Sequence, residues 1–132
     1  GLPAAMTAHV VYSSIDPDNP ASTSAVVTRN VIRGEIGFDN LLMSDDLSMQ
    51  ALTGPMRARA EAVIAAGSDL ALHCNGEIDE MRAAAEGVPT LAGRSLERFS
   101  DACACIARRD PYDKGRALQL LAGVLGQQTP TV

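Results

Sequence analysis

The sequence has few aromatic side chains and no tryptophan, since aromatic residues make up only 3% of its 132 residues. Any core must therefore be built from aliphatic side chains, and hydrophobic residues as a whole make up 46% of the chain, which is enough for one domain. Basic residues are also scarce, with 11 Lys and Arg against 16 Asp and Glu and a net charge of −5. Without a basic patch interleaved with aromatics, we expect no nucleic-acid partner.

Cysteine is too sparse for a disulfide framework. Of the three cysteines, Cys103 and Cys105 are two residues apart, and on a helix they would point about 200° apart. We therefore expect a reducing compartment, the cytoplasm. No ligand spacing predicts a metal site, so we expect no metal and no cofactor. No apolar run approaches the roughly 20 residues of a membrane helix, and no signal peptide opens the chain, so we expect no membrane partner.

Short apolar runs alternate with amphipathic segments along the chain. The runs at 6–12, 41–44 and 69–74 predict buried parallel strands. The predicted helices are one that follows the cap candidates Ser22, Thr23 and Ser24 and ends at Gly37, and four more at 55–66, 77–86, 95–109 and 116–125. This alternation predicts an α/β fold made of parallel βα units.

The predicted helices should turn apolar stripes toward the strands. For the first helix the stripe consists of Val27, Val31, Ile32 and Ile36. For the helix at 95–109 it includes Leu96, Phe99 and Cys103. A (β/α)₈ barrel takes roughly 250 residues, so this chain has room for about three of its eight units. We therefore expect a fragment of a longer protein.

Two carboxylates, Asp45 and Asp46, end the apolar run Leu41–Met43. In open α/β sheets and β/α barrels, catalytic residues lie at the carboxyl ends of the strands. A carboxylate there is a candidate nucleophile, general base or metal ligand, although it could also cap the segment that follows. The neighbouring Ser44 lies outside any Gly-x-Ser-x-Gly motif, so we expect it to pack rather than to react.

Several segments resemble, in order and spacing, a known family of glycosidases. They are Met6–Val10, Asp16–Pro17, Pro20–Ser24, Val31–Arg33, Ile36–Phe38, Ser44–Met49 and Ala65–Leu70. Over about residues 4–107 the chain looks like the C-terminal part of the catalytic barrel of bacterial β-N-acetylglucosaminidases of glycoside hydrolase family 3. The resemblance implies the C-terminal portion, about three βα units, of a TIM (β/α)₈ barrel over residues 1–109. Residues 110–132 would then be a C-terminal extension, partly disordered.

The resemblance also implies an activity. It would be the retaining hydrolysis of terminal non-reducing N-acetylglucosamine from peptidoglycan fragments, a cytoplasmic step of cell-wall recycling. The first Asp of the family's Ser-Asp-Asp motif is the nucleophile, which corresponds to Asp45. We expect His9 and Asp46, also at strand ends, to contact the carbohydrate substrate. The family's general acid/base is a His in a Lys-His-Phe-Pro-Gly-His-Gly segment, and no part of this sequence matches it. The isolated chain should therefore be inactive and require the missing N-terminal barrel units.

Other interpretations of the residues stay open. The strand-end carboxylates could form the Mg²⁺ site of a small α/β binding or regulatory module. That site would need another acidic residue near the end of the first strand, where this chain has His9. His9 could equally be a core histidine, and His73 at the end of the third strand is more consistent with packing than with a site role. A truncated product with a purely structural role is the third possibility.

Overall fold

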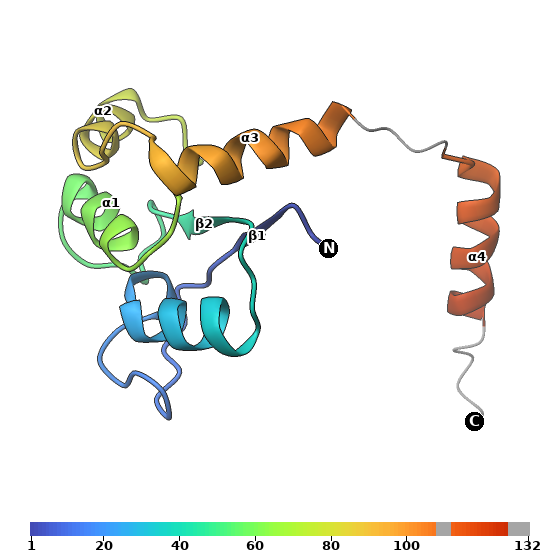
Figure 1. The fold of residues 1–132 in the computed structure, drawn as a ribbon, viewed down its shortest axis with the longest axis horizontal. Coiled ribbons are helices and arrows are strands. Elements are labelled where there is room, and N and C mark those ends of the chain that lie inside the picture. Colours follow the sequence, from blue (N-terminus) through green and yellow to red (C-terminus); the bar gives the residue numbers. More distant parts are fainter. Residues whose placement is uncertain (108–111, 127–132) are drawn as a thin grey trace.

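The computed structural model describes residues 1–107 and 112–126 (Figure 1). It contains a parallel three-stranded sheet in the order β1-β2-β3. The strands are β1 (Ala4–Met6), β2 (Leu41–Asp46) and β3 (Leu70–Leu72). Both pairings are parallel, and helical segments connect each strand to the next. The prediction of an α/β fold with a parallel sheet is therefore confirmed.

Six helical segments accompany the strands in the described part of the chain. They are η1 (Ala21–Thr23), η2 (Val27–Glu35), α1 (Met56–Ala65), α2 (Ile78–Glu86), α3 (Gly93–Ala107) and α4 (Lys114–Gly126). Each predicted helix is present, and α4 forms despite Gly115 and Gly123. The expected disorder at 127–132 lies outside the described residues. Among the helices described, none is both long enough and apolar enough to cross a membrane.

The first strand is shorter than predicted. β1 ends at Met6, so the expected strand over 6–12 is wrong beyond Met6, although the Thr7 N–H still bonds the Met43 carbonyl at 2.9 Å. The carbonyls of Ala8 and Val10 instead accept hydrogen bonds from the backbone N–H groups of η1, at 3.1 and 2.8 Å. Because this segment bonds to η1, it cannot continue the ladder with β2. The third strand is likewise shorter than the predicted 69–74.

The η2 helix is wider than an α-helix. Its hydrogen bonds include one from the Ile36 N–H to the Val31 carbonyl, five residues earlier, at 2.8 Å. Because this spacing changes which side chains share a face, the predicted stripe is only partly correct. Val27 is buried, whereas Ile36 is 67% exposed.

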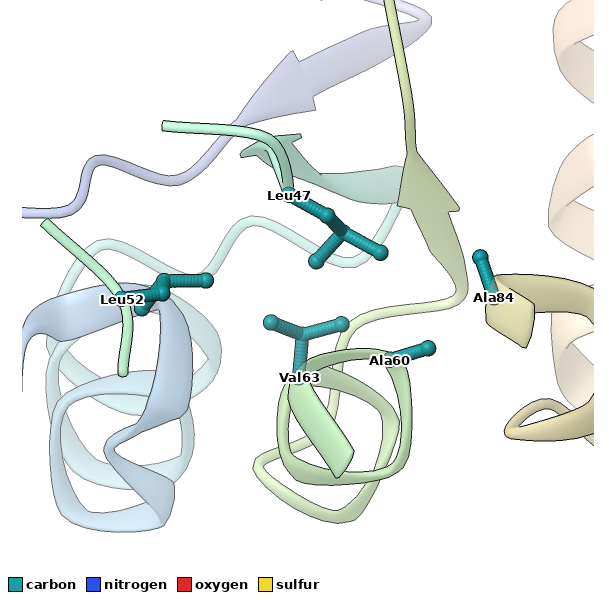
Figure 2. Packing of buried hydrophobic residues seen from close by; sticks show 5 residues of the cluster. All are labelled: Leu47, Leu52, Ala60, Val63 and Ala84. Atoms are coloured by element: carbon teal, nitrogen blue, oxygen red, sulfur yellow. The ribbon is translucent and has the colours of Figure 1, made fainter. Parts of the chain in front are cut away.

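The core lies between the end of β2, α1 and α2. Its buried members are Leu47, Leu52, Ala60, Val63 and Ala84 (Figure 2). Gly87 permits this packing, because a Cβ there would lie 2.4 Å from the Arg57 carbonyl oxygen of α1. Leu47 immediately follows Asp46 and is fully buried, so the core anchors the chain where the two carboxylates emerge.

The predicted apolar face of α3 is exposed in this chain. Leu96 and Phe99 are 45% and 38% exposed, and Cys103 is also exposed. The prediction that they are buried is wrong here, because no element within the described ranges covers this side of α3. The first turns of α3 are instead anchored by their arginines, since Arg94 and Arg98 both pair with Asp39.

Candidate active site

The end of β2 that carries Asp45 is irregular. Met43 pairs with Leu70 and Asp46 pairs with Leu72, so three steps along β2 face two steps along β3. The Ser44 hydroxyl accepts a hydrogen bond from the Leu72 N–H at 3.0 Å and donates one to the Asp45 carbonyl at 2.8 Å. An irregularity of this kind, a β-bulge, changes the direction of the side chains that follow it, and β-bulges are frequent beside active sites. Ser44 is fully buried and packs as predicted.

The Asp45 carboxylate is fixed at one oxygen and open at the other. Its Oδ1 accepts a hydrogen bond from the N–H of Asp46 at 2.8 Å. Within the described residues no donor reaches Oδ2, and the side chain is only partly buried. Asp45 therefore has a carboxylate oxygen available for nucleophilic attack.

The Asp46 carboxylate has a different environment. Its Oδ1 accepts hydrogen bonds from the N–H groups of Ser48 and Cys74, at 3.0 and 3.1 Å, and its Oδ2 accepts one from the Ser48 hydroxyl at 2.5 Å. The hydrogen bond from the Ser48 side chain is the main cause that lowers the pKa of Asp46 below its ordinary range. Asp46 thus joins the turn after β2 to Cys74, two residues after β3, and both of its oxygens are engaged.

His9 lies between η1 and the end of β2. Its Nδ1 is 2.6 Å from the Ser22 hydroxyl, and its Nε2 is 2.9 Å from the carbonyl oxygen of Asp46. The structure therefore brings His9 to the strand end that carries Asp45 and Asp46. With both ring nitrogens bonded inside the protein, direct hydrogen bonding to a sugar would require one of these contacts to open.

His73 is the first residue after β3. Its Nε2 pairs with Glu80 at 2.9 Å, and this hydrogen bond is the main cause that lowers the pKa of Glu80. Its Nδ1 is buried and has no hydrogen-bond partner among the residues described. In the same part of the chain, no group of three or more His, Cys, Asp or Glu side chains is arranged to hold a metal ion.

Ser22 is a site residue that the sequence interpretation missed. The three hydroxyl residues 22–24 were predicted as helix caps, and Ser24 does cap η2, accepting a hydrogen bond from the Val27 N–H at 3.1 Å. Ser22, by contrast, is fully buried and faces His9. The available signal was a hydroxyl two residues after Pro20, which is not specific enough to predict a partner thirteen residues away.

Asp69 forms a second polar cluster just before β3, at the opposite end of that strand. One of its oxygens accepts hydrogen bonds from Arg33 and the Leu42 N–H, both at 2.9 Å, and the other from Ser95 and Arg98, at 2.6 and 3.0 Å. Burial raises the pKa of Asp69, but these hydrogen bonds outweigh it and the net shift is downward. The cluster joins η2, β2 and α3, and its position indicates a structural role.

Comparison with known proteins identifies the family. A model of the glycosyl hydrolase family 3 N-terminal domain matches residues 1–108. The chain belongs to glycosyl hydrolase family 3. It is 44% identical over 100 residues to a β-hexosaminidase of Pseudomonas aeruginosa, a match covering 74% of this chain and 27% of that protein. It is 47% identical over 76 residues to a β-hexosaminidase of Alkalilimnicola ehrlichii, covering 56% of this chain and 22% of the relative.

Structures of the family agree with this assignment. The β-N-acetylglucosaminidase from Thermotoga maritima superposes with a TM-score of 0.61 at 28% identity, over 76% of this chain and 25% of that one. The family 3 β-N-acetylglucosaminidase from Paenibacillus sp. str. FPU-7 gives a TM-score of 0.64 at 25% identity, over 87% and 25%. The chain therefore spans about a quarter of the length of these relatives.

Proposed function

We propose that these residues form the nucleophile-bearing part of a retaining β-N-acetylhexosaminidase that releases terminal N-acetylglucosamine from peptidoglycan fragments. Family membership and relatives named as β-hexosaminidases support the reaction class. The observation that carries the proposal is Asp45, a carboxylate at the carboxyl end of a parallel strand with one oxygen fixed and the other accessible.

In this proposal Asp45 acts in two steps. Its free oxygen attacks the anomeric carbon while the bond from that carbon to the leaving oxygen breaks, and the leaving oxygen takes a proton from a general acid elsewhere in the protein. Water then attacks the same carbon and loses a proton to the same group, which frees Asp45. A carboxylate suits this role because the oxocarbenium-like transition state is positively charged.

The sheet is proposed to be the C-terminal portion, about three βα units, of a (β/α)₈ barrel. Three parallel strands joined by helical crossovers fit consecutive units of such a barrel, and β1 and β3 both present open edges. Residues 1–109 would supply the barrel units and 110–132 the extension. The remaining units would bring the general acid/base and the other sugar contacts, and a cytoplasmic location would fit the proposed pathway.

The site gives less support to the alternative of a small Mg²⁺-binding module. Both oxygens of Asp46 are engaged by N–H and O–H donors, so this carboxylate would have to break those bonds to bind a hard cation. Near the end of β1, where the Mg²⁺ site would need another carboxylate, the chain has His9, and its imidazole is a poor Mg²⁺ ligand.

Hydrolysis of an aryl β-N-acetylglucosaminide by the native protein that contains these residues tests the proposal. Asp45→Asn keeps the size of the side chain but removes the nucleophilic charge, and kcat should fall by about 10⁴-fold or more. Asp46→Asn is the comparison variant, because it makes the same change one residue away, and its kcat should fall by less than about 10-fold. Full hydrolysis by Asp45→Asn, or no hydrolysis by the unmodified protein, would refute the proposed function.

A further inference from the structure

His9 connects a buried hydroxyl to the backbone of the strand end that carries Asp45. Ser22 is fully buried, and its hydroxyl lies 2.6 Å from the Nδ1 of His9. On the other side of the ring, Nε2 lies 2.9 Å from the carbonyl oxygen of Asp46. The imidazole thus bridges η1 and the end of β2, between which the whole of η2 lies in the sequence.

The partners of the ring determine its protonation pattern. A backbone carbonyl can only accept a hydrogen bond, so Nε2 must carry a proton and donate it. In the neutral ring Nδ1 is then an acceptor, and the Ser22 hydroxyl donates to it. The direction of donation therefore runs from Ser22 to His9 and from His9 to Asp46.

The backbone of Asp46, which His9 contacts, also contacts the Asp45 side chain. The N–H of Asp46 donates to Asp45 Oδ1 at 2.8 Å, so the orientation of the Asp45 carboxylate depends on where the Asp46 backbone lies. The Asp46 side chain is tied to Ser48 and Cys74, and its carbonyl also accepts the Met49 N–H at 3.1 Å. His9, which also contacts Ser22 of η1, adds a further hydrogen bond to the same carbonyl.

We propose that His9 is a positioning residue for Asp45, acting through the Asp46 backbone, and that Ser22 holds its imidazole in the Nε2–H form. This inference rests on the proposed function, since it concerns the orientation of the Asp45 carboxylate as the nucleophile. Small errors in the position of a reacting group lower the rate strongly, while substrate affinity depends mainly on other contacts. His9 would therefore influence kcat more than KM.

Two substitutions separate the contacts of the ring. Gln places an amide N–H near the position of Nε2, so His9→Gln can still donate to the Asp46 carbonyl. Asn reaches only the position of Nδ1, so His9→Asn can still accept from Ser22 but loses Asp46. Ser22→Ala removes the hydroxyl that holds the ring in the Nε2–H form.

The test measures kcat and KM for an aryl β-N-acetylglucosaminide with the native protein, alongside thermal melts. We expect His9→Asn to lower kcat by about 10- to 100-fold with KM changed by less than about 3-fold, and His9→Gln to recover to within about 5-fold of the unmodified protein. Ser22→Ala should lower kcat in the same direction as His9→Asn. Arg57→Ala, at an exposed ion pair on α1, is the control and should change neither constant.

A purely structural role for His9 would give another pattern. His9→Asn and His9→Gln would then lower the melting temperature to similar extents while kcat per folded molecule stayed unchanged, and this result would overturn the positioning role. Loss of activity in Asp45→Asn together with full activity in His9→Asn refutes the positioning role alone. Full activity in Asp45→Asn refutes the proposed function, and the positioning role with it.

Discussion

Asp45 and Asp46 are adjacent carboxylates with opposite environments. Asp45 has a free oxygen, whereas Asp46 receives three hydrogen bonds that join the turn after β2 to Cys74, two residues after β3. A charged acceptor with three donors stabilises the fold, and a carboxylate with a free oxygen remains available for chemistry. We therefore expect substitution of Asp45 to lower activity and substitution of Asp46 to lower stability.

Asp46→Asn should cost stability more than activity. An amide can accept at one position only, so at least one donor loses its partner, and hydrogen bonds to charged groups contribute about 1.5–3 kcal/mol each. The free energy of unfolding, measured by urea titration, should fall by an amount of this order, while kcat per folded molecule falls by less than about 10-fold. A loss of kcat equal to that of Asp45→Asn would contradict the division of roles.

The sequence predicted the location of the site but not its internal contacts. An apolar run that ends in two Asp residues indicates a strand end, and order and spacing of several motifs indicated the family. The contacts of His9 with Ser22 and Asp46 depend on how β1, η1 and β2 pack, and local pattern carries no information on that packing. The roles assigned to Asp45, His9 and Asp46 stay predictions until substitution and labelling test them.

At the level of elements, Asp39 and Asp69, which share Arg98 as an ion-pair partner, should make stability depend on pH in the acid range. The hydrogen bonds from Arg98 and then Arg94 lower the pKa of Asp39 from 3.8 to about 2, and the pKa of Asp69 is also lowered. A carboxyl whose pKa is lower in the folded state stabilises the fold above its unfolded pKa and loses that contribution as pH falls. Stability should therefore decline between about pH 4 and pH 2.

Acid titration of the melting temperature measures this decline. In Asp69→Asn the protein should be less stable at neutral pH, because Arg33 and Arg98 lose their buried partner, and the decline below pH 4 should be shallower. An unchanged acid profile in Asp69→Asn would show that this cluster does not carry the pH dependence.

Gly67, just after α1, packs closely against Thr28 of η2. Its φ of +109° is unfavourable for other residues, and a Cβ there would lie 2.9 Å from Thr28 Cγ2. Gly67→Ala should therefore lower the free energy of unfolding by about 1–3 kcal/mol. Gly54→Ala is the matched control, because its φ is +85° but no atom lies within 4 Å of the added Cβ. Equal losses in the two variants would show that the contact with Thr28 has no effect.

The lengths of the elements show where local pattern fails. The helices α1 and α2 were predicted to within about a residue. Pro55 precedes α1 and acidic residues occupy the first turn of α2, and a glycine follows the last turn of each. The strand β1 was overestimated because the apolar residues Val10 and Val11 are typical of strands, whereas the carbonyls of Ala8 and Val10 bond to η1. The exposed face of α3 was predicted to be buried because an apolar stripe does not show whether its partner is present.

At the level of the whole molecule, the 132-residue chain alone should self-associate and lack glycosidase activity. The open edges of β1 and β3 and the exposed Leu96 and Phe99 leave unpaired backbone and apolar surface. Loss of general acid/base catalysis alone typically costs about 10²- to 10⁴-fold in rate. Light scattering and an aryl β-N-acetylglucosaminide assay check both expectations. A monodisperse monomer with a sharp two-state melt, or turnover abolished by Asp45→Asn, would contradict them.

Covalent labelling of the nucleophile tests the central claim most directly. The native protein is incubated with a 5-fluoro N-acetylglucosaminyl fluoride, whose fluorine slows breakdown of the glycosyl-enzyme, and is then digested for peptide mass mapping. We predict one glycosylated residue, Asp45, and no label on the same peptide in Asp45→Asn. A label on Asp46, or on any residue outside the end of β2, would show that the nucleophile has been assigned to the wrong residue.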